Sequence, residues 1–315
     1  MCERPTKKVK TLHDAESEIA TLKAELAAAR TQLAPKPTLG ELMRRPATCY
    51  GTCVLSTSPK WVSALASCPI DFVFIDTEHI PIPRDTLSWM CNAYRGVGLH
   101  TLVRIPEPDP YAATMALDGG ASGIVAPYLE TVEQVQALRG AVKLRPYKGK
   151  RLQEKLDNVA GASPEHEAEY CKRVNRSNAL VLNIESQPAI DNLDEILKIP
   201  DIDALLIGPH DLSCNLGVPE QFDHPKFIAA CRTIWQKARA AGVGAAIHQG
   251  KPPDTPGCTP ADEINWLKNG CNVLVHGSDV TLFTTNLKNH LREIRAGVGE
   301  QEGADKESTS SQACM

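Results

Sequence analysis

Five side chains capable of acid–base or metal chemistry lie at the ends of short apolar segments of this sequence. Asp76 and His79 follow one segment, Arg104 ends another, and Glu185 and Asp211 follow two more. A buried carboxylate needs a cation or hydrogen-bond donors. Two carboxylates brought together suit a hard divalent cation that keeps positions open for water and substrate, whereas zinc would favour Cys or His ligands. We therefore predict that Glu185 and Asp211 bind Mg²⁺, or Mn²⁺ or Co²⁺ in its place.

The other three side chains suit proton transfer and the stabilisation of negative charge. His79 lies three residues after Asp76, so the carboxylate can hold one ring nitrogen and leave the other as a base. Arg104 carries a permanent, forked charge suited to an enolate or carboxylate oxygen. Structural roles compete with these: His79 as a rim histidine, Arg104 in a salt bridge to Asp76 or Glu78, and Asp211 as a helix cap.

The segments that carry these residues alternate between strand and helix patterns. Strand-like apolar segments occur at 49–55, 71–76, 101–105, 123–127, 180–184, 204–207, 243–247 and 273–275. Helical periodicity occurs at 84–95, 110–117, 131–144, 189–197, 226–241 and 261–268. Eight strands alternating with helices over about 250 residues predict a (β/α)₈ barrel, whose active site lies at the carboxyl ends of the strands. No glycine-rich nucleotide-binding motif follows any of the strands.

The two ends of the chain differ from this central part. Leu12, Ile19, Leu26 and Leu33 recur every seven residues, and the pattern stops at two prolines. Residues 1–37 are therefore predicted to form a helical extension, either a short coiled coil or a solvated amphipathic helix. Residues 38–298 form the predicted barrel domain. Residues 299–315 are rich in Glu, Ser, Gln and Gly and are predicted to be a disordered tail.

Composition argues against several other classes of protein. The net charge of −4 leaves no positively charged footprint for nucleic acid, and no apolar run is long enough to cross a membrane. The eleven cysteines include no C-x-x-C pair in an enzyme-sized chain. Free thiols are then a better interpretation than a disulfide framework, which predicts a cytoplasmic protein.

Five motifs in order resemble the HpcH/HpaI family of class II 2-oxo-acid aldolases. They are D-T-E-H-x-P (76–81), V-R-I-P (103–106), G-x-x-A-P-Y-x-E-T-x-E (123–133), I-E-S (184–186) and I-G-P-x-D-L-S (207–213). The resemblance runs from about Thr38 to Gly297. It implies that Glu185 and Asp211 bind the divalent metal and that backbone N–H groups of His210 and Asp211 hold the substrate carboxylate. Many relatives have Gln where Asn183 stands, which leaves the acceptor substrate open.

The resemblance also implies the chemistry of the remaining residues. Arg104 would stabilise the oxygen of a pyruvate enolate, and His79 with Asp76 would handle protons. The expected reactions are aldol cleavage or condensation of a 2-oxo acid and decarboxylation of oxaloacetate, in a homo-oligomer, commonly a hexamer. Two alternatives remain. One is a CoA-dependent lyase of the citrate-lyase type, for which no basic cluster is visible. The other is a non-catalytic assembly protein, which has no reason to retain all the site residues.

Overall fold

The structure is a computed structural model that describes residues 19–23, 36–157, 165–249 and 258–300. The chain divides into two compact units, Met1–Pro37 and Thr38–Met315. In the first unit, residues 19–23 are helical and exposed. The rest of the predicted heptad pattern lies outside the described residues, as do residues 301–315 of the predicted tail.

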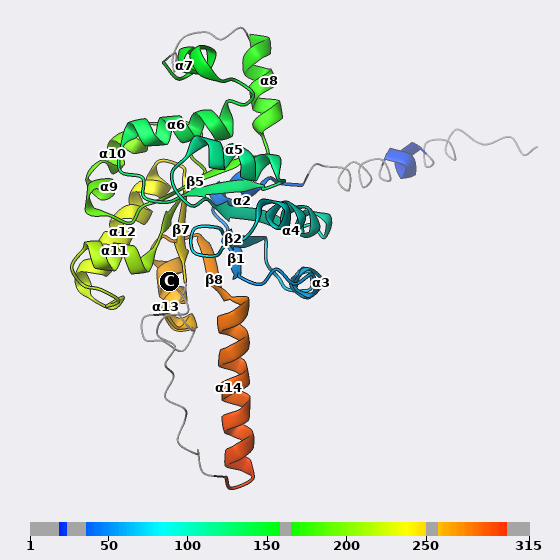
Figure 1. Cartoon of the computed structure of the whole chain (residues 1–315), viewed down its shortest axis with the longest axis vertical. Helices are drawn as coiled ribbons and strands as arrows, with labels where there is room; N and C mark the ends of the chain where they lie inside the picture. Colours follow the sequence, from blue (N-terminus) through cyan, green and yellow to red (C-terminus); the bar gives the residue numbers. More distant parts are fainter. Residues whose placement is uncertain (1–18, 24–35, 158–164, 250–257, 301–315) are drawn as a thin grey trace, which may run out of the picture. The chain divides into compact units, whose positions relative to one another are not determined.

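The second unit is a closed barrel of eight parallel strands joined in sequence order (Figure 1). The strands are β1 (Cys49–Val54), β2 (Phe72–Asp76), β3 (His100–Arg104), β4 (Gly123–Ala126), β5 (Ala179–Asn183), β6 (Ala204–Ile207), β7 (Gly244–His248) and β8 (Val273–Ser278). The predicted (β/α)₈ barrel is thus confirmed. Predicted and observed strand ends differ by at most one residue, except that β8 runs on to Ser278.

Strand residues alternate between two buried regions. In β2, Phe72 and Phe74 belong to a cluster built from the strands and a single short helix, α2 (Leu39–Arg44), so this cluster fills the barrel interior. Val73 and Ile75 belong to the second cluster, which includes most of the buried helix residues. Because both faces of each strand are buried, the strands appear in the sequence as continuous apolar runs. Helix α2 contacts β5, β6 and β7 and closes the barrel at the N-terminal ends of its strands.

Helices cover the outside of the barrel. They are α3 (Lys60–Ala66), α4 (Arg84–Gly96), α5 (Pro110–Asp118), α6 (Val132–Lys143), α7 (Gly149–Asp157), α8 (Glu165–Asn175), α9 (Gln187–Asp191), α10 (Leu193–Ile196), α11 (Pro209–Asn215), α12 (Pro225–Ala240), α13 (Pro260–Lys268) and α14 (Asp279–Gly297). The helix predicted over 189–197 is instead two short helices, because the chain turns at Asn192, which ends α9 and caps α10.

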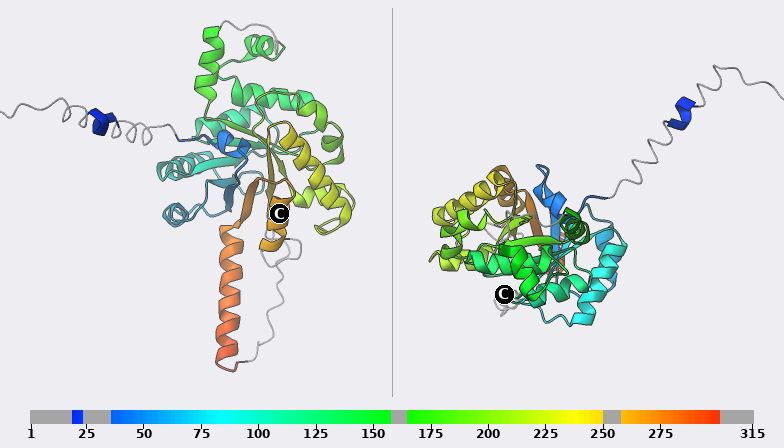
Figure 2. Two further views of the ribbon diagram at one scale, coloured as in Figure 1. Left: turned by 180° about the vertical axis from the view of Figure 1, so that it is seen from behind. Right: turned by 90° about the horizontal axis from the view of Figure 1, so that it is seen from above.

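Two helical regions stand clear of the barrel wall when the ribbon is seen from behind (Figure 2, left). Helices α7 and α8 form an excursion beside α6, and α8 contacts α6. Helix α14 begins at a capping box on Ser278 and then extends away from the barrel, so that its residues beyond the first turns are mostly exposed.

Cysteine placement agrees with the sequence analysis. No disulfide joins any two of the nine described cysteines, and seven of them are buried. Burial raises the pKa of the Cys91 thiol to about 11 and that of the Cys271 thiol to about 12, so these two thiols are unreactive core residues. Among the described helices, none combines the length and apolar character needed to span a bilayer.

Candidate active site at the carboxyl ends of the strands

The predicted metal ligands meet at a single tyrosine. Tyr128, two residues after the end of β4, donates its backbone N–H to Glu185 Oε1 at 3.0 Å and its hydroxyl to Asp211 Oδ1 at 3.0 Å. The backbone of Tyr128 has φ of 48°, in the left-handed region that bulky residues rarely adopt. This conformation lets one residue contact both carboxylates, which links the ends of β4, β5 and β6.

Glu185 is a buried carboxylate held only by neutral donors. It is 2% exposed, and it also accepts the Asn183 side-chain amide at 3.0 Å. Burial raises its pKa to about 7, although the Tyr128 N–H works in the opposite direction. A buried carboxylate needs a compensating cation, and no salt bridge reaches Glu185 from the described residues. Its surroundings therefore fit a cation ligand.

The segment after β6 is shaped by this carboxylate. A Cβ added at Gly208 would lie 2.4 Å from Glu185 Oε2, so only glycine allows so close an approach. Gly208 is the N-cap of α11, which places Asp211 in the first helical turn rather than at the cap. The His210 and Asp211 N–H groups belong to the same first turn, where backbone donors lack intrahelical acceptors.

Arg104 is fixed by two carboxylates. Its Nε and Nη2 donate to Asp76 at 2.9 and 2.6 Å, and its Nε lies 3.1 Å from Glu78 Oε2. Asp76 and Arg104 are register partners in β2 and β3, which explains their contact. Burial alone would raise the pKa of Asp76, but the hydrogen bonds and charge of Arg104 lower it. Arg104 therefore forms the salt bridges to Asp76 and Glu78 that were considered as its alternative, structural role.

The predicted pairing of Asp76 with His79 is not what the structure shows. Asp76 is occupied by Arg104, and the nearest carboxylate to the imidazole is Glu78, whose Oε2 lies 3.8 Å from His79 Nε2. The cause is the strand register, which the sequence does not reveal. His79 remains beside the Arg104 network with its side chain 37% exposed, so it is accessible from solvent.

The His210 side chain contacts Glu220. Its ring Nδ1 lies 3.2 Å from Glu220 Oε1. In the structure β6 ends at Ile207, and His210 lies in α11.

Three further residues of this region were not singled out by the sequence analysis. Tyr128 follows the end of β4, and the same strand-end rule would have found it. His248 ends β7, stacks on Phe74 with ring centroids 5.0 Å apart, and has a pKa lowered to about 4 by burial and by the charge of Arg104. The Arg104 guanidinium in turn lies over the Phe74 ring, with its Cζ atom 5.7 Å from the ring centroid. The barrel mouth therefore offers a neutral imidazole beside the fixed cation.

Comparisons with known proteins identify the family of this chain. The model of the HpcH/HpaI aldolase/citrate lyase family matches residues 50–252. A 2-keto-3-deoxy-L-rhamnonate aldolase of Escherichia coli O1:K1 / APEC is 30% identical over 263 residues, covering 82% of this chain and 92% of the relative.

Solved structures share the fold. Macrophomate synthase superposes with a TM-score of 0.62 at 26% identity, covering 80% of this chain and 85% of that one. A family protein from Burkholderia cenocepacia J2315 gives a TM-score of 0.68 at 24% identity, covering 82% and 98%. The chain therefore belongs to the HpcH/HpaI aldolase/citrate lyase family and is an enzyme of its carbon–carbon lyase type.

Proposed function

We propose that this enzyme is divalent-cation dependent and makes or breaks a carbon–carbon bond next to a 2-oxo acid, through the enolate of pyruvate. The observation that carries the proposal is that Glu185 and Asp211 both accept hydrogen bonds from Tyr128. Arg104 interacts electrostatically with Glu185. Together these residues provide two anionic ligands and one fixed cation at the same end of the barrel.

Glu185 and Asp211 are the residues that would hold the cation. No set of three or more His, Cys, Asp or Glu side chains in the described part of the chain is arranged to hold a metal. Two carboxylates are enough for Mg²⁺, which usually keeps waters and substrate oxygens among its ligands. The cation would supply a Lewis acid for negative charge developing on the substrate's C2 oxygen.

The chain's own groups would bind and orient the 2-oxo acid. Backbone N–H groups of His210 and Asp211 would hold the substrate carboxylate, as helix first turns hold anions. Arg104 would face the developing enolate oxygen with a charge that Asp76 keeps in place. His79, accessible and beside Glu78, would take or return the proton of the hydroxyl that aldol cleavage converts to a carbonyl.

The relatives support two reactions. The Escherichia coli relative is named for a sugar-derived 2-oxo acid, which supports aldol cleavage or condensation. Decarboxylation of oxaloacetate would yield the same enolate, and addition of that enolate to a second substrate is supported by the likeness to macrophomate synthase. A CoA-dependent reaction would need a phosphate site near Arg104, and in the described residues the large basic cavity lies at the other end of the barrel.

The test is to supply oxaloacetate with Mg²⁺ and follow its loss, and to supply pyruvate with a panel of aldehydes and follow their condensation. We expect activity that EDTA abolishes and Mg²⁺, Mn²⁺ or Co²⁺ restores, because the two carboxylates alone cannot stabilise an enolate. Full activity in EDTA would contradict cation dependence. Loss of neither substrate under any condition would contradict the proposed pyruvate-enolate chemistry.

A homo-oligomer, with a hexamer as the expected form, is also proposed. Helix α14 and its C-cap Val298 present an apolar stripe, each of whose side chains is at least 43% exposed: Val280, Phe283, Leu287, Leu291, Ile294 and Val298. These positions recur every three or four residues and so lie on one side of the helix. A stripe of this length is costly to leave in water, which supports packing against another copy of the chain.

Phe283→Gln combined with Leu287→Gln is expected to shift the enzyme toward smaller species, because it places two amides in the apolar stripe. Light scattering at several protein concentrations measures the change. Asn289→Ser, on the opposite side of the same helix, is the control and should leave the mass unchanged. An unaltered oligomer in the double variant would show that α14 does not carry the interface.

A further inference from the structure

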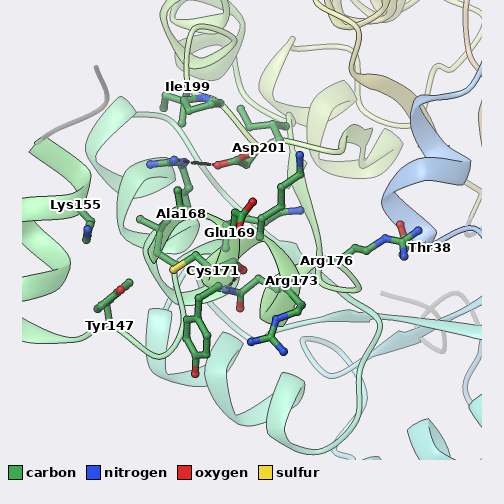
Figure 3. A pocket seen from close by; sticks show the side chains of 18 of the residues that line it. Thr38, Tyr147, Lys155, Ala168, Glu169, Cys171, Arg173, Arg176, Ile199 and Asp201 are labelled. Atoms are coloured by element: carbon green, nitrogen blue, oxygen red, sulfur yellow. Dashed lines mark hydrogen bonds and ion pairs between the residues drawn. The ribbon is translucent and has the colours of Figure 1, made fainter. Parts of the chain in front are cut away.

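A large cavity lies at the end of the barrel opposite the candidate active site. It has a volume of about 1570 Å³ and is bounded by α2, α6, α8 and the segments that lead into β6 and β7. Figure 3 shows Arg173 of α8, Arg176 just after the end of that helix, and Asp201, which precedes β6, around this cavity. The N-terminal ends of the strands face it, whereas Glu185 and Asp211 follow the carboxyl ends of β5 and β6.

The cavity wall is strongly basic. Eight lysine and arginine side chains line it against four acidic ones. On the inner wall, Lys143 Nζ lies 2.5 Å from Asp203 Oδ2, and Arg44 also pairs with Asp203. Asp203 accepts a backbone hydrogen bond as well, from Leu180 N–H at 2.7 Å. One carboxylate therefore balances two cations at this point.

Arg139 adds a third cation to the inner wall. Its Nε and Nη2 both donate to Asp201 Oδ2, at 3.0 and 2.9 Å. The side chain is 9% exposed, and its Nη1 is buried with no acceptor among the described residues. A buried guanidinium N–H without an acceptor is costly, and three cations share two carboxylates here. The pKa of Lys143 is lowered to about 8 by burial and by the charges of Arg44 and Arg139.

The outer wall carries further positive charge in solvent. Lys172 and Arg173 of α8 are exposed and have no ion-pair partner in the described part of the chain. The Arg173 guanidinium lies over the Tyr170 ring at 5.6 Å. Donors on both walls line the same cavity, which is larger than one inorganic ion needs and has room for a small molecule.

We propose that this cavity binds a small molecule that carries phosphate groups. A phosphate would accept from the unpartnered Arg139 Nη1 and offset the excess charge of the inner wall, while Lys172 and Arg173 would contact a second anionic group. The site is separate from the barrel mouth and does not depend on the proposed lyase reaction.

Pyrophosphate is the probe, titrated calorimetrically into the full-length enzyme in EDTA and low salt, so that no divalent cation at the barrel mouth contributes. We expect saturable binding that is weakened at least about tenfold in Lys172→Ala/Arg173→Ala, because charge-assisted contacts to phosphate are the strong ones. Lys60→Ala/Lys268→Ala makes the same charge change on exposed residues outside the cavity and should bind as the wild type does.

A second variant tests the inner wall. Arg139→Gln should also weaken binding. Because Asp201 loses its partner in this variant, its thermal unfolding must be measured as well. If Arg139→Gln fails to fold, the Lys172→Ala/Arg173→Ala variant decides the question. Equal affinity in the α8 variant and its control, or heat that never saturates, would overturn the proposal. Malonate bound as tightly as pyrophosphate would overturn the assignment of phosphate as the ligand class.

Discussion

Glu185→Gln and Asp211→Asn are each expected to lower kcat by at least about 100-fold, roughly 2.7 kcal/mol of transition-state stabilisation. Each substitution keeps the side-chain shape and removes one of the two negative charges that would hold the cation. In Glu185→Gln, the new side-chain amide would face the Tyr128 N–H and the Asn183 amide, which both donate to the carboxylate of the wild-type enzyme. Steady-state kinetics with oxaloacetate and with an aldol substrate measure the loss.

Tyr128→Phe provides a graded comparison for these two variants. It removes only the hydroxyl that donates to Asp211 and leaves the backbone N–H on Glu185. We expect weaker Mn²⁺ binding and a smaller loss of kcat than in Asp211→Asn, partly recovered at high Mn²⁺ concentration. Mn²⁺ affinity can be followed by electron paramagnetic resonance without substrate. Unchanged Mn²⁺ affinity in both carboxylate variants would remove them from the metal site.

The barrel could be predicted because its strands are buried on both faces. Segments such as Phe72–Ile75 are then continuous apolar runs. Eight such runs that alternate with helical patterns are typical of a parallel barrel. Helices with a buried stripe and a side-chain cap, such as α6 and α12, were also predicted. Helix α7 was missed because it is short, none of its residues is buried, and Leu152 and Leu156 are its only aliphatic side chains. Helix α14 was also missed. It follows β8, and that strand runs on to Ser278 instead of ending at residue 275 as predicted.

The sequence predicted which residues lie at the site, because they follow the strand ends, but not which partners they contact. Because all strands are parallel, residues after their carboxyl ends must gather at one end of the barrel, which brought Arg104, Glu185 and Asp211 together. Which partner each side chain selects depends on register. Asp76 is aligned with Arg104 across β2 and β3, so its carboxylate accepts hydrogen bonds from Arg104 rather than from His79. The role of Tyr128 depends on a left-handed backbone conformation at a non-glycine residue, which no sequence pattern here indicates.

Arg104→Lys is expected to lower kcat for both decarboxylation and aldol cleavage by on the order of 100-fold, because it removes a preorganised donor of the kind that stabilises an oxyanion. Lysine keeps the charge but loses the fork that contacts Asp76 through Nε and Nη2. The ammonium would then be free to move toward either Asp76 or Glu78. Circular dichroism should show an intact fold, since Arg104 lies at the end of its strand.

His79→Ala is expected to separate the two reactions that Arg104→Lys impairs together. Aldol cleavage needs a base for the substrate hydroxyl, so its kcat should fall by about 100-fold or more. Loss of CO₂ from oxaloacetate leaves the electron pair of the broken bond on the enolate, and no proton has to be removed first. Decarboxylation should therefore lose much less. Parallel kinetics on the two substrates decide it: equal losses would mean that His79 positions the Arg104 network through Glu78 rather than acting as the base.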